Sequence, residues 1–240
     1  MRDALAPTGA LRATFLGTNP VQGIVNAQTK EVTGPAADIV KELARRMGVP
    51  FTITGTDVSG VMETVRSRTA DIGFLAFDPT RAVGITFTQS YSLAHNTYMV
   101  PKDSPLQTFA DADRKGVRIG VAGGDSVDLF LSRTLKQAEL VRPADRSMES
   151  IVRMLSVGEV QAYAANRQRL TEAAARAPNM RLLDGSVLPV QQAMVVTQEN
   201  AAALAILNRF IDEARASGFL RQAIERAKLA GVDVAPKDAR

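Results

Sequence analysis

The chain has 240 residues, 45% hydrophobic and 22% charged, which is ordinary for a globular protein with a substantial core. Its net charge of +4 is spread over predicted helices, and with nine Phe, three Tyr and no Trp this does not favour nucleic-acid binding through a basic stripe with stacking rings. The absence of Cys excludes disulfides and thiolate chemistry, a single His argues against histidine-based zinc sites and triads, and we expect no metal or cofactor.

The first half of the chain is predicted to alternate strands with helices. We expect strands at Leu11–Leu16, Phe51–Thr54, Asp71–Phe77, Ile85–Phe87 and Thr97–Val100, and helices at Ala37–Met47 and Ser59–Arg68. Gly34 and Pro35 open the first helix, and Gly48 and Pro50 flank its end. The apolar run Asp71–Phe77 is typical of a strand buried on both faces.

The second half follows the same alternation. We expect strands at Val117–Ala122, Glu139–Arg142, Val160–Ala165, Met180–Leu183 and Gln191–Thr197, and helices at Ser126–Lys136, Ser147–Val157, Leu170–Ala177, Ala201–Ala216 and Phe219–Leu229. Gly158 suits a left-handed helix cap. The polar stretch from Gly231 to Arg240 is expected to be loose.

Two pairs of segments are alike, and they indicate two similar halves. Val61–Arg81 and Ile151–Leu170 each read as a helix, a break and a small-residue strand, while Leu11–Asn19 and Val117–Ser126 are strands that enter Gly-containing turns. Chance likeness between helix–strand units is the alternative. We predict an α/β fold of two lobes, residues 1–100 plus 189–240 and an inserted 101–188, with a two-stranded hinge and a ligand cleft between them at the strand ends.

Several short motifs carry a resemblance to a known family, from Leu11 to about Leu229. They are Gly34 to Asp38 as G-x-x-x-D, Ala70-Asp71, Asp78-Pro79-Thr80-Arg81 followed by Ile85–Tyr91, Val117–Ser126, and Gly158–Ala162. The chain resembles the family 3 extracellular solute-binding proteins, the periplasmic receptors of polar amino-acid ABC importers. The resemblance implies the type II periplasmic-binding fold.

The family arginine that clamps the ligand carboxylate falls at Arg81, and the assisting backbone amides fall in the turn Gly124-Asp125-Ser126. A guanidinium offers a planar fork of donors to a carboxylate, and amides at a helix start favour an anion. The alternative for Arg81 is a surface ion pair with Asp78. For Asp125 we favour a helix-capping role, and for Ser126 ligand contact.

Three positions depart from the family pattern. The aspartate that holds a ligand ammonium falls at Asn166, a site threonine or serine falls at Ala76, and the usual aromatic falls at Val58. An amide cannot neutralise a buried ammonium, so we expect a small carboxylate-bearing solute that need not be an amino acid. Arg167 is either a clamp for a second acid group or a solvated arginine at the rim.

Other candidate contacts follow from their places in the predicted strands. Phe77 ends a strand and is the candidate for apolar contact, whereas Asn19 follows the first strand and is either a polar contact or a turn residue. Asp78, Asp57 or Asp125 would supply the missing negative charge if the ligand were an ordinary amino acid. Gln191 and Gln192, at the second crossing, either reach the ligand or bond across the hinge.

The predicted function is the substrate-binding component of an ABC importer, not an enzyme, with a small carboxylate ligand and membrane permease subunits as partners. We expect a periplasmic monomer whose signal peptide has been removed from this chain. One alternative is an enzyme resembling cyclohexadienyl dehydratase, for which Glu172 and Glu159 are candidate acids. The other is the ligand-sensing domain of a receptor.

Overall fold

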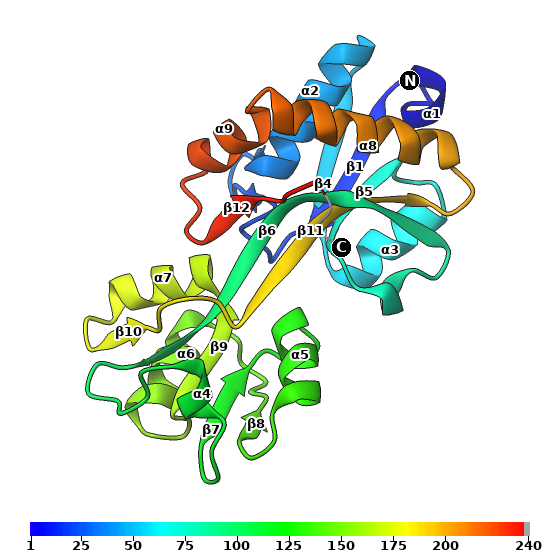
Figure 1. Cartoon of the computed structure of the whole chain (residues 1–240). Helices are drawn as coiled ribbons and strands as arrows, with labels where there is room; N and C mark the ends of the chain where they lie inside the picture. The colour runs from blue at the N-terminus through cyan, green and yellow to red at the C-terminus, as the bar shows by residue number, and fades with distance from the viewer. Residues whose placement is uncertain (238–240) are drawn as a thin grey trace. The chain divides into compact units, whose positions relative to one another are not determined.

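The computed structural model describes residues 1–237, which form two compact units. Among the described residues, the first unit comprises Met1–Leu93 and residues 191–237, and the second comprises Ala94–Val190. Strands alternate with helices along the chain (Figure 1), so the predicted α/β class is confirmed. The chain passes between the units within strand β6 (Ile85–Pro101) and again within strand β11 (Leu188–Thr197).

The sheet of the first unit has the strand order β4-β1-β5-β11-β6, with β12 also paired to β6. Its elements are α1 (Arg2–Leu5), β1 (Leu11–Leu16), β2 (Ile24–Val25), β3 (Val32–Thr33), α2 (Pro35–Met47), β4 (Phe51–Thr56), α3 (Val58–Arg66), β5 (Ile72–Ala76), the 3₁₀ helix η1 (Pro79–Arg81), α8 (Ala201–Ala216), α9 (Phe219–Arg226) and β12 (Val232–Val234), with the adjoining parts of β6 and β11. β1 runs parallel to β4 and β5, whereas β11 is antiparallel to β5. The carboxyl ends of the parallel strands therefore lie at one edge of this sheet.

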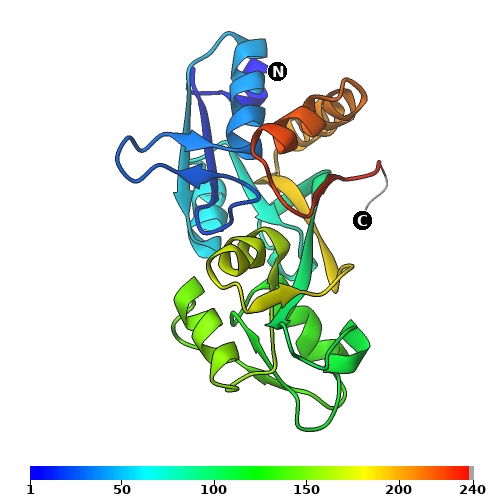
Figure 2. The ribbon, with the colours of Figure 1, turned by 90° about the vertical axis from the view of Figure 1, so that its left-hand side faces the viewer.

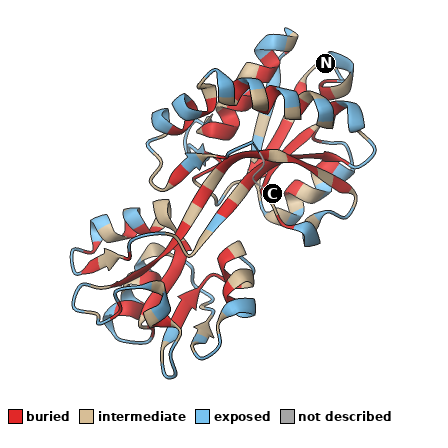
Figure 3. Ribbon diagram, in the orientation of Figure 1, coloured by how far each residue is buried: buried red, intermediate tan, exposed pale blue. Residues whose placement is uncertain are grey.

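Helices cover both faces of this sheet, because its central strands are apolar on both sides. Phe74 packs into the cluster formed with α2 and α8, and its neighbour Leu75 packs into the cluster formed with α3. Figure 3 shows these strands buried and the outer helix faces exposed. Gly73 lets α3 approach closely, since a Cβ there would lie 2.8 Å from methyl groups of Val61 and Val195.

The sheet of the second unit has the order β6-β9-β7-β8, with β10 paired to β6. Its further elements are α4 (Phe109–Ala112), β7 (Arg118–Val121), α5 (Ser126–Thr134), β8 (Glu139–Val141), α6 (Met148–Ser156), β9 (Ala162–Asn166), α7 (Arg167–Arg176) and β10 (Met180–Leu182). β7 runs parallel to β8 and β9. α4 and α5 pack on one face and α6 and α7 on the other.

Several predicted elements need correction. The two strands expected at Ile85–Phe87 and Thr97–Val100 are one strand of 17 residues, β6. Residues 232–234 form β12 rather than a loose tail, and Ala235 is fully buried, although the last three residues of that expected tail lie outside the described residues. The β2–β3 hairpin, which projects from the first unit in Figure 2, was not predicted.

Candidate functional site

The turn after β5 is shaped by Asp78, the residue that caps the short helix η1. Oδ1 of Asp78 accepts hydrogen bonds from the backbone N–H of Thr80 at 2.8 Å and from its hydroxyl at 2.6 Å. Pro79 suits the first position of the helix because it has no N–H to leave unbonded. The Asp78–Thr80 interaction thus places Arg81 one helical turn beyond the strand end.

Arg81 is half-buried, and its Nη1 donates to the backbone carbonyl of Ala76 at 3.2 Å. Within residues 1–237 it has no carboxylate partner. A half-buried guanidinium has further N–H donors beside the one bonded to Ala76, and such a group is suited to bind an anion. The same turn is tied to α3 by Arg66, whose Nε donates to the carbonyl of Val83 at 2.8 Å.

Phe77 and Ala76 lie at the strand end but are engaged in packing. The backbone N–H of Phe77 donates to Gln191 at 2.8 Å, and its half-buried ring meets Phe87 edge to face at 5.2 Å between centroids. Ala76 is buried and pairs in register with Gln192 on β11. Asn19 also reaches Gln192, since its Nδ2 donates to Gln192 Oε1 at 3.4 Å.

In the second unit, Asp128 stabilises the turn before α5. Asp125 occupies the N-cap position but its side chain makes no capping hydrogen bond, so the capping role expected for it is wrong. Oδ2 of Asp128 accepts the backbone N–H of Gly124 at 2.8 Å, and the carboxylate pairs with Arg142 at 2.8 Å. Gly124 has φ +83°, a conformation that favours glycine. Ser126 is half-buried and is the first residue of the helix.

The pKa of Asp128 shows how this turn is held. Burial opposes ionisation of the carboxyl, but the hydrogen bonds from Arg142 and from the Gly124 amide outweigh burial and lower its pKa. The carboxylate is therefore charged at neutral pH, and it stabilises the Gly124–Ser126 turn by accepting the hydrogen bond from the Gly124 N–H.

Asn166 and Arg167, the polar pair at the end of β9, make hydrogen bonds with nearby backbone groups of the second unit. Asn166 is the N-cap of α7, and its Oδ1 accepts the backbone N–H of Gln168 at 2.9 Å. Nη2 of Arg167 donates to the carbonyl of Leu183 at 3.1 Å and to that of Gly185. In the described part of the chain Arg167 also lacks a carboxylate partner. The helix therefore starts at Arg167, three residues earlier than predicted.

The two candidate acids of the enzymatic alternative are placed in helix-surface interactions. Oε1 of Glu172 on α7 accepts a hydrogen bond from Nε2 of Gln168 at 2.7 Å. Glu159 follows α6 and pairs with Arg153 at 3.2 Å, where both side chains are exposed.

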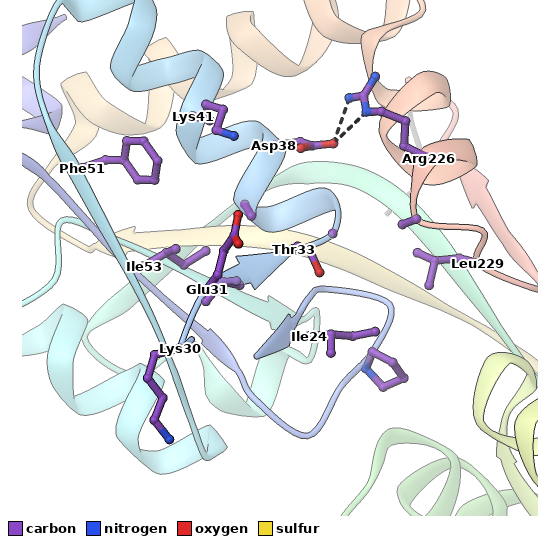
Figure 4. A pocket seen from close by; sticks show the side chains of 15 residues that line it. Ile24, Lys30, Glu31, Thr33, Asp38, Lys41, Phe51, Ile53, Arg226 and Leu229 are labelled. Carbon is purple, nitrogen blue, oxygen red and sulfur yellow. Dashed lines mark hydrogen bonds and ion pairs between the residues drawn. The ribbon is translucent and has the colours of Figure 1, made fainter. Parts of the chain in front are cut away.

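A hollow of about 530 Å³ lies elsewhere in the first unit, between the β2–β3 hairpin, α2, β4 and the end of α9. Figure 4 shows Phe51 and Ile53 on one side and the ion pair of Asp38 with Arg226 on the other, joined at 2.8 Å. None of the predicted ligand residues lines it. Asp38, which belongs to the helix-opening motif, therefore lines this hollow, whereas Arg81 does not.

Across the part of the chain that the structure describes, no helix combines the length and apolar character needed to cross a membrane.

Comparison with known proteins identifies a family over most of the chain. Residues 11–227 match the sequence model of the bacterial extracellular solute-binding proteins, family 3. A curated protein of Campylobacter jejuni named "Probable histidine-binding protein" is 23% identical over 207 residues, which cover 84% of this chain and 79% of that protein.

Solved structures show the same fold. The solute receptor for L-cysteine of Neisseria gonorrhoeae is 25% identical, with a TM-score of 0.74 over 93% of this chain and 92% of that one. A P235GK mutant of ArgBP from T. maritima is 22% identical, with a TM-score of 0.73 over 94% of this chain and 98% of that one.

Proposed function

The chain belongs to the bacterial extracellular solute-binding proteins, family 3, and from this we propose that it is the substrate-binding component of an ABC importer. It captures a small carboxylate-bearing solute, an amino acid or an organic acid, and delivers it to membrane permease subunits. The periplasm is the compartment in which such a protein would act. Of the relatives described above, the Campylobacter jejuni protein is named as a binding protein and the Neisseria gonorrhoeae protein as a solute receptor.

The observation that supports carboxylate binding is the state of Arg81. This guanidinium is half-buried, held by one carbonyl at 3.2 Å, and not paired with any carboxylate among residues 1–237. Hydrogen bonds to a charged group contribute about 1.5–3 kcal/mol. A solute carboxylate bound here would accept hydrogen bonds from this guanidinium and offset its charge.

The solute class is narrower than the family alone would suggest. Asn166, where the resemblance places the ammonium-binding aspartate, is neutral and already uses Oδ1 to cap α7. An amide does not compensate a buried ammonium. We therefore favour an acid whose recognition does not depend on a paired ammonium.

The test is isothermal titration of unliganded protein with the standard L-amino acids and with acetate, malonate and succinate. For the tightest-binding compound, Arg81→Ala should weaken affinity by about 10- to 100-fold, the loss expected for a charged hydrogen-bonded pair. Arg66→Ala is the matched control, because Arg66 donates to a carbonyl of the same turn and is exposed. Equal affinities of the Arg81→Ala and wild-type proteins would refute the role of Arg81.

A further inference from the structure

Three amide side chains join the end of β1 to the start of β11 within the first unit. They belong to Asn19, Gln22 and Gln192, and we refer to them as the amide relay. Gln22 is fully buried and Gln192 is 1% exposed. Two buried carboxamides need hydrogen-bond partners, and protein groups supply them here.

The orientation of each amide in the relay is set by backbone groups at its two ends. The N–H of Leu16 can only donate, and it donates to Gln22 Oε1 at 3.0 Å. Nε2 of Gln22 must therefore face Gln192, to which it donates at 2.9 Å. Gln192 presents its oxygen Oε1 as the acceptor.

The other end of the relay is fixed in the same way. The backbone N–H of Val21 donates to Asn19 Oδ1 at 3.3 Å, which turns Nδ2 of Asn19 towards Gln192 Oε1 at 3.4 Å. Gln192 Oε1 thus accepts from both Gln22 and Asn19. Nδ2 carries two hydrogens, and within residues 1–237 the second has no protein acceptor.

The relay meets the strand end that carries Arg81. Gln192 is the register partner of Ala76, and the carbonyl of Ala76 accepts the bond from Arg81 Nη1. Asn19 and Arg81 each contact this Ala76–Gln192 pair, one through a side chain and the other through a carbonyl. Both present N–H donors.

We propose that Gln22 and Gln192 are positioning residues that fix Asn19 with its amide nitrogen outward, so that Asn19 and Arg81 together receive an acceptor group of the solute. This inference rests on the proposed function and deepens it. The group that suits two N–H donors is a carboxylate, whereas an ammonium would face donors only. If the side-chain amides of the relay were flipped, Asn19 would present Oδ1 instead of Nδ2, and a solute carboxylate would face an acceptor instead of a donor.

The relay can be tested without any solute, by NMR of the ¹⁵N-labelled free protein. The carboxamide protons of Gln22 should exchange with water far more slowly than those of exposed Gln222. Gln192→Leu removes the acceptor while keeping an apolar volume of similar size, and it should accelerate Gln22 exchange at least tenfold. Rapid exchange of the Gln22 amide in the wild-type protein would overturn the relay.

Its role in recognition is tested with Gln192→Glu, which keeps both acceptor contacts and adds a negative charge. Affinity for the tightest-binding of acetate, malonate, succinate and the L-amino acids should fall by at least about tenfold near pH 8. It should recover near pH 5, because burial raises the pKa of a carboxyl and the introduced group becomes neutral. Gln222→Glu adds the same charge at an exposed position of the first unit, and it should leave the affinity unchanged both near pH 8 and near pH 5.

The outcomes separate the inference from the function on which it rests. Slow Gln22 exchange with unchanged affinity of Gln192→Glu at both pH values would make the relay structural only, and would overturn its positioning role. If none of these probes bound to the wild-type protein, carboxylate capture itself would be contradicted, and the recognition role with it. Loss at the higher pH with recovery at the lower pH supports both.

Discussion

Replacing Asp128 by Asn should destabilise the second unit, because Asp128 is the buried anion beneath the turn that opens α5. Its carboxylate, 7% exposed, accepts the Gly124 N–H at 2.8 Å and the Ser132 hydroxyl at 3.2 Å, and pairs with Arg142. Asparagine keeps the shape but offers one acceptor where the carboxylate offers two. Hydrogen bonds to charged groups contribute about 1.5–3 kcal/mol and neutral ones about 0.5–1.5.

Arg142 is 45% exposed, so solvent screens part of its attraction to Asp128. We therefore expect Asp128→Asn to lower the free energy of unfolding by about 2 kcal/mol at neutral pH, which corresponds to about 4–8 °C in Tm for a chain of this size. The effect should depend on pH. The pKa of Asp128 is lowered in the folded protein, so its stabilisation is complete above the unfolded pKa of about 3.9 and is lost as pH falls through the folded pKa.

The assay is urea unfolding followed by far-ultraviolet circular dichroism, since the chain has no Trp. The gap between Asp128→Asn and wild type should be present at about pH 7 and should shrink towards zero as pH falls from about 3.9 through the lower folded pKa of Asp128. Asp103→Asn removes a charge from an exposed position of the same unit and is the control. An unchanged gap at neutral and at low pH would refute the charge-based argument, and no gap at neutral pH would refute the role of Asp128.

Two further predictions concern the first unit. Gly73→Ala should cost about 1–3 kcal/mol in the free energy of unfolding, because the new Cβ would lie 2.8 Å from a Val195 methyl in a packed core; thermal unfolding measures this, and an unchanged Tm would contradict it. Arg215→Ala should release β12, because Nε of Arg215 donates to the Ala235 carbonyl at 2.8 Å. The expected readout is faster proteolysis C-terminal to α9. Resistance equal to that of the wild-type protein would contradict this and show that strand pairing alone holds β12 in place.

Where the sequence is strongly periodic, its pattern predicts the fold closely. Helix α8 begins and ends where its apolar spacing indicates, at Ala201 and Ala216. β6 could not be predicted as one strand because its middle is polar. Ser90 and Ser92 are buried there, and a buried hydroxyl run reads as a loop until its partners across the sheet are known.

The C-terminal strand β12 could not be predicted from the sequence pattern either. Val232–Val234 is too short to be recognised by period, and it is a strand because β6 offers it a partner. Arg215 and the buried Ala235 hold it there. These contacts join segments far apart in the chain, so a local pattern carries no trace of them.

The residues of the candidate site were also predicted only in part from the sequence. Motifs single out Arg81, but its lack of a carboxylate partner is visible only in the structure. No sequence signal points to Gln22, since a Gln in a turn reads as a surface residue. In the structure it is fully buried and donates to Gln192, which is 170 positions away. Asp125 was assigned the capping role that Asp128 partly fills, because both acidic residues fit the first turn of a helix.

Asn166 offers a direct test of which charge the solute carries. Asp and Asn are comparable N-caps, so Asn166→Asp should leave α7 in place while adding a carboxylate at the end of β9. If the position faces the solute, L-glutamate should gain about 10- to 100-fold in affinity relative to glutarate, which lacks the ammonium, since a charged hydrogen bond contributes about 1.5–3 kcal/mol. Titration of both compounds into wild-type and variant protein gives the ratio. An unchanged ratio would show that Asn166 serves α7 alone, and that the neutral residue there says nothing about the solute.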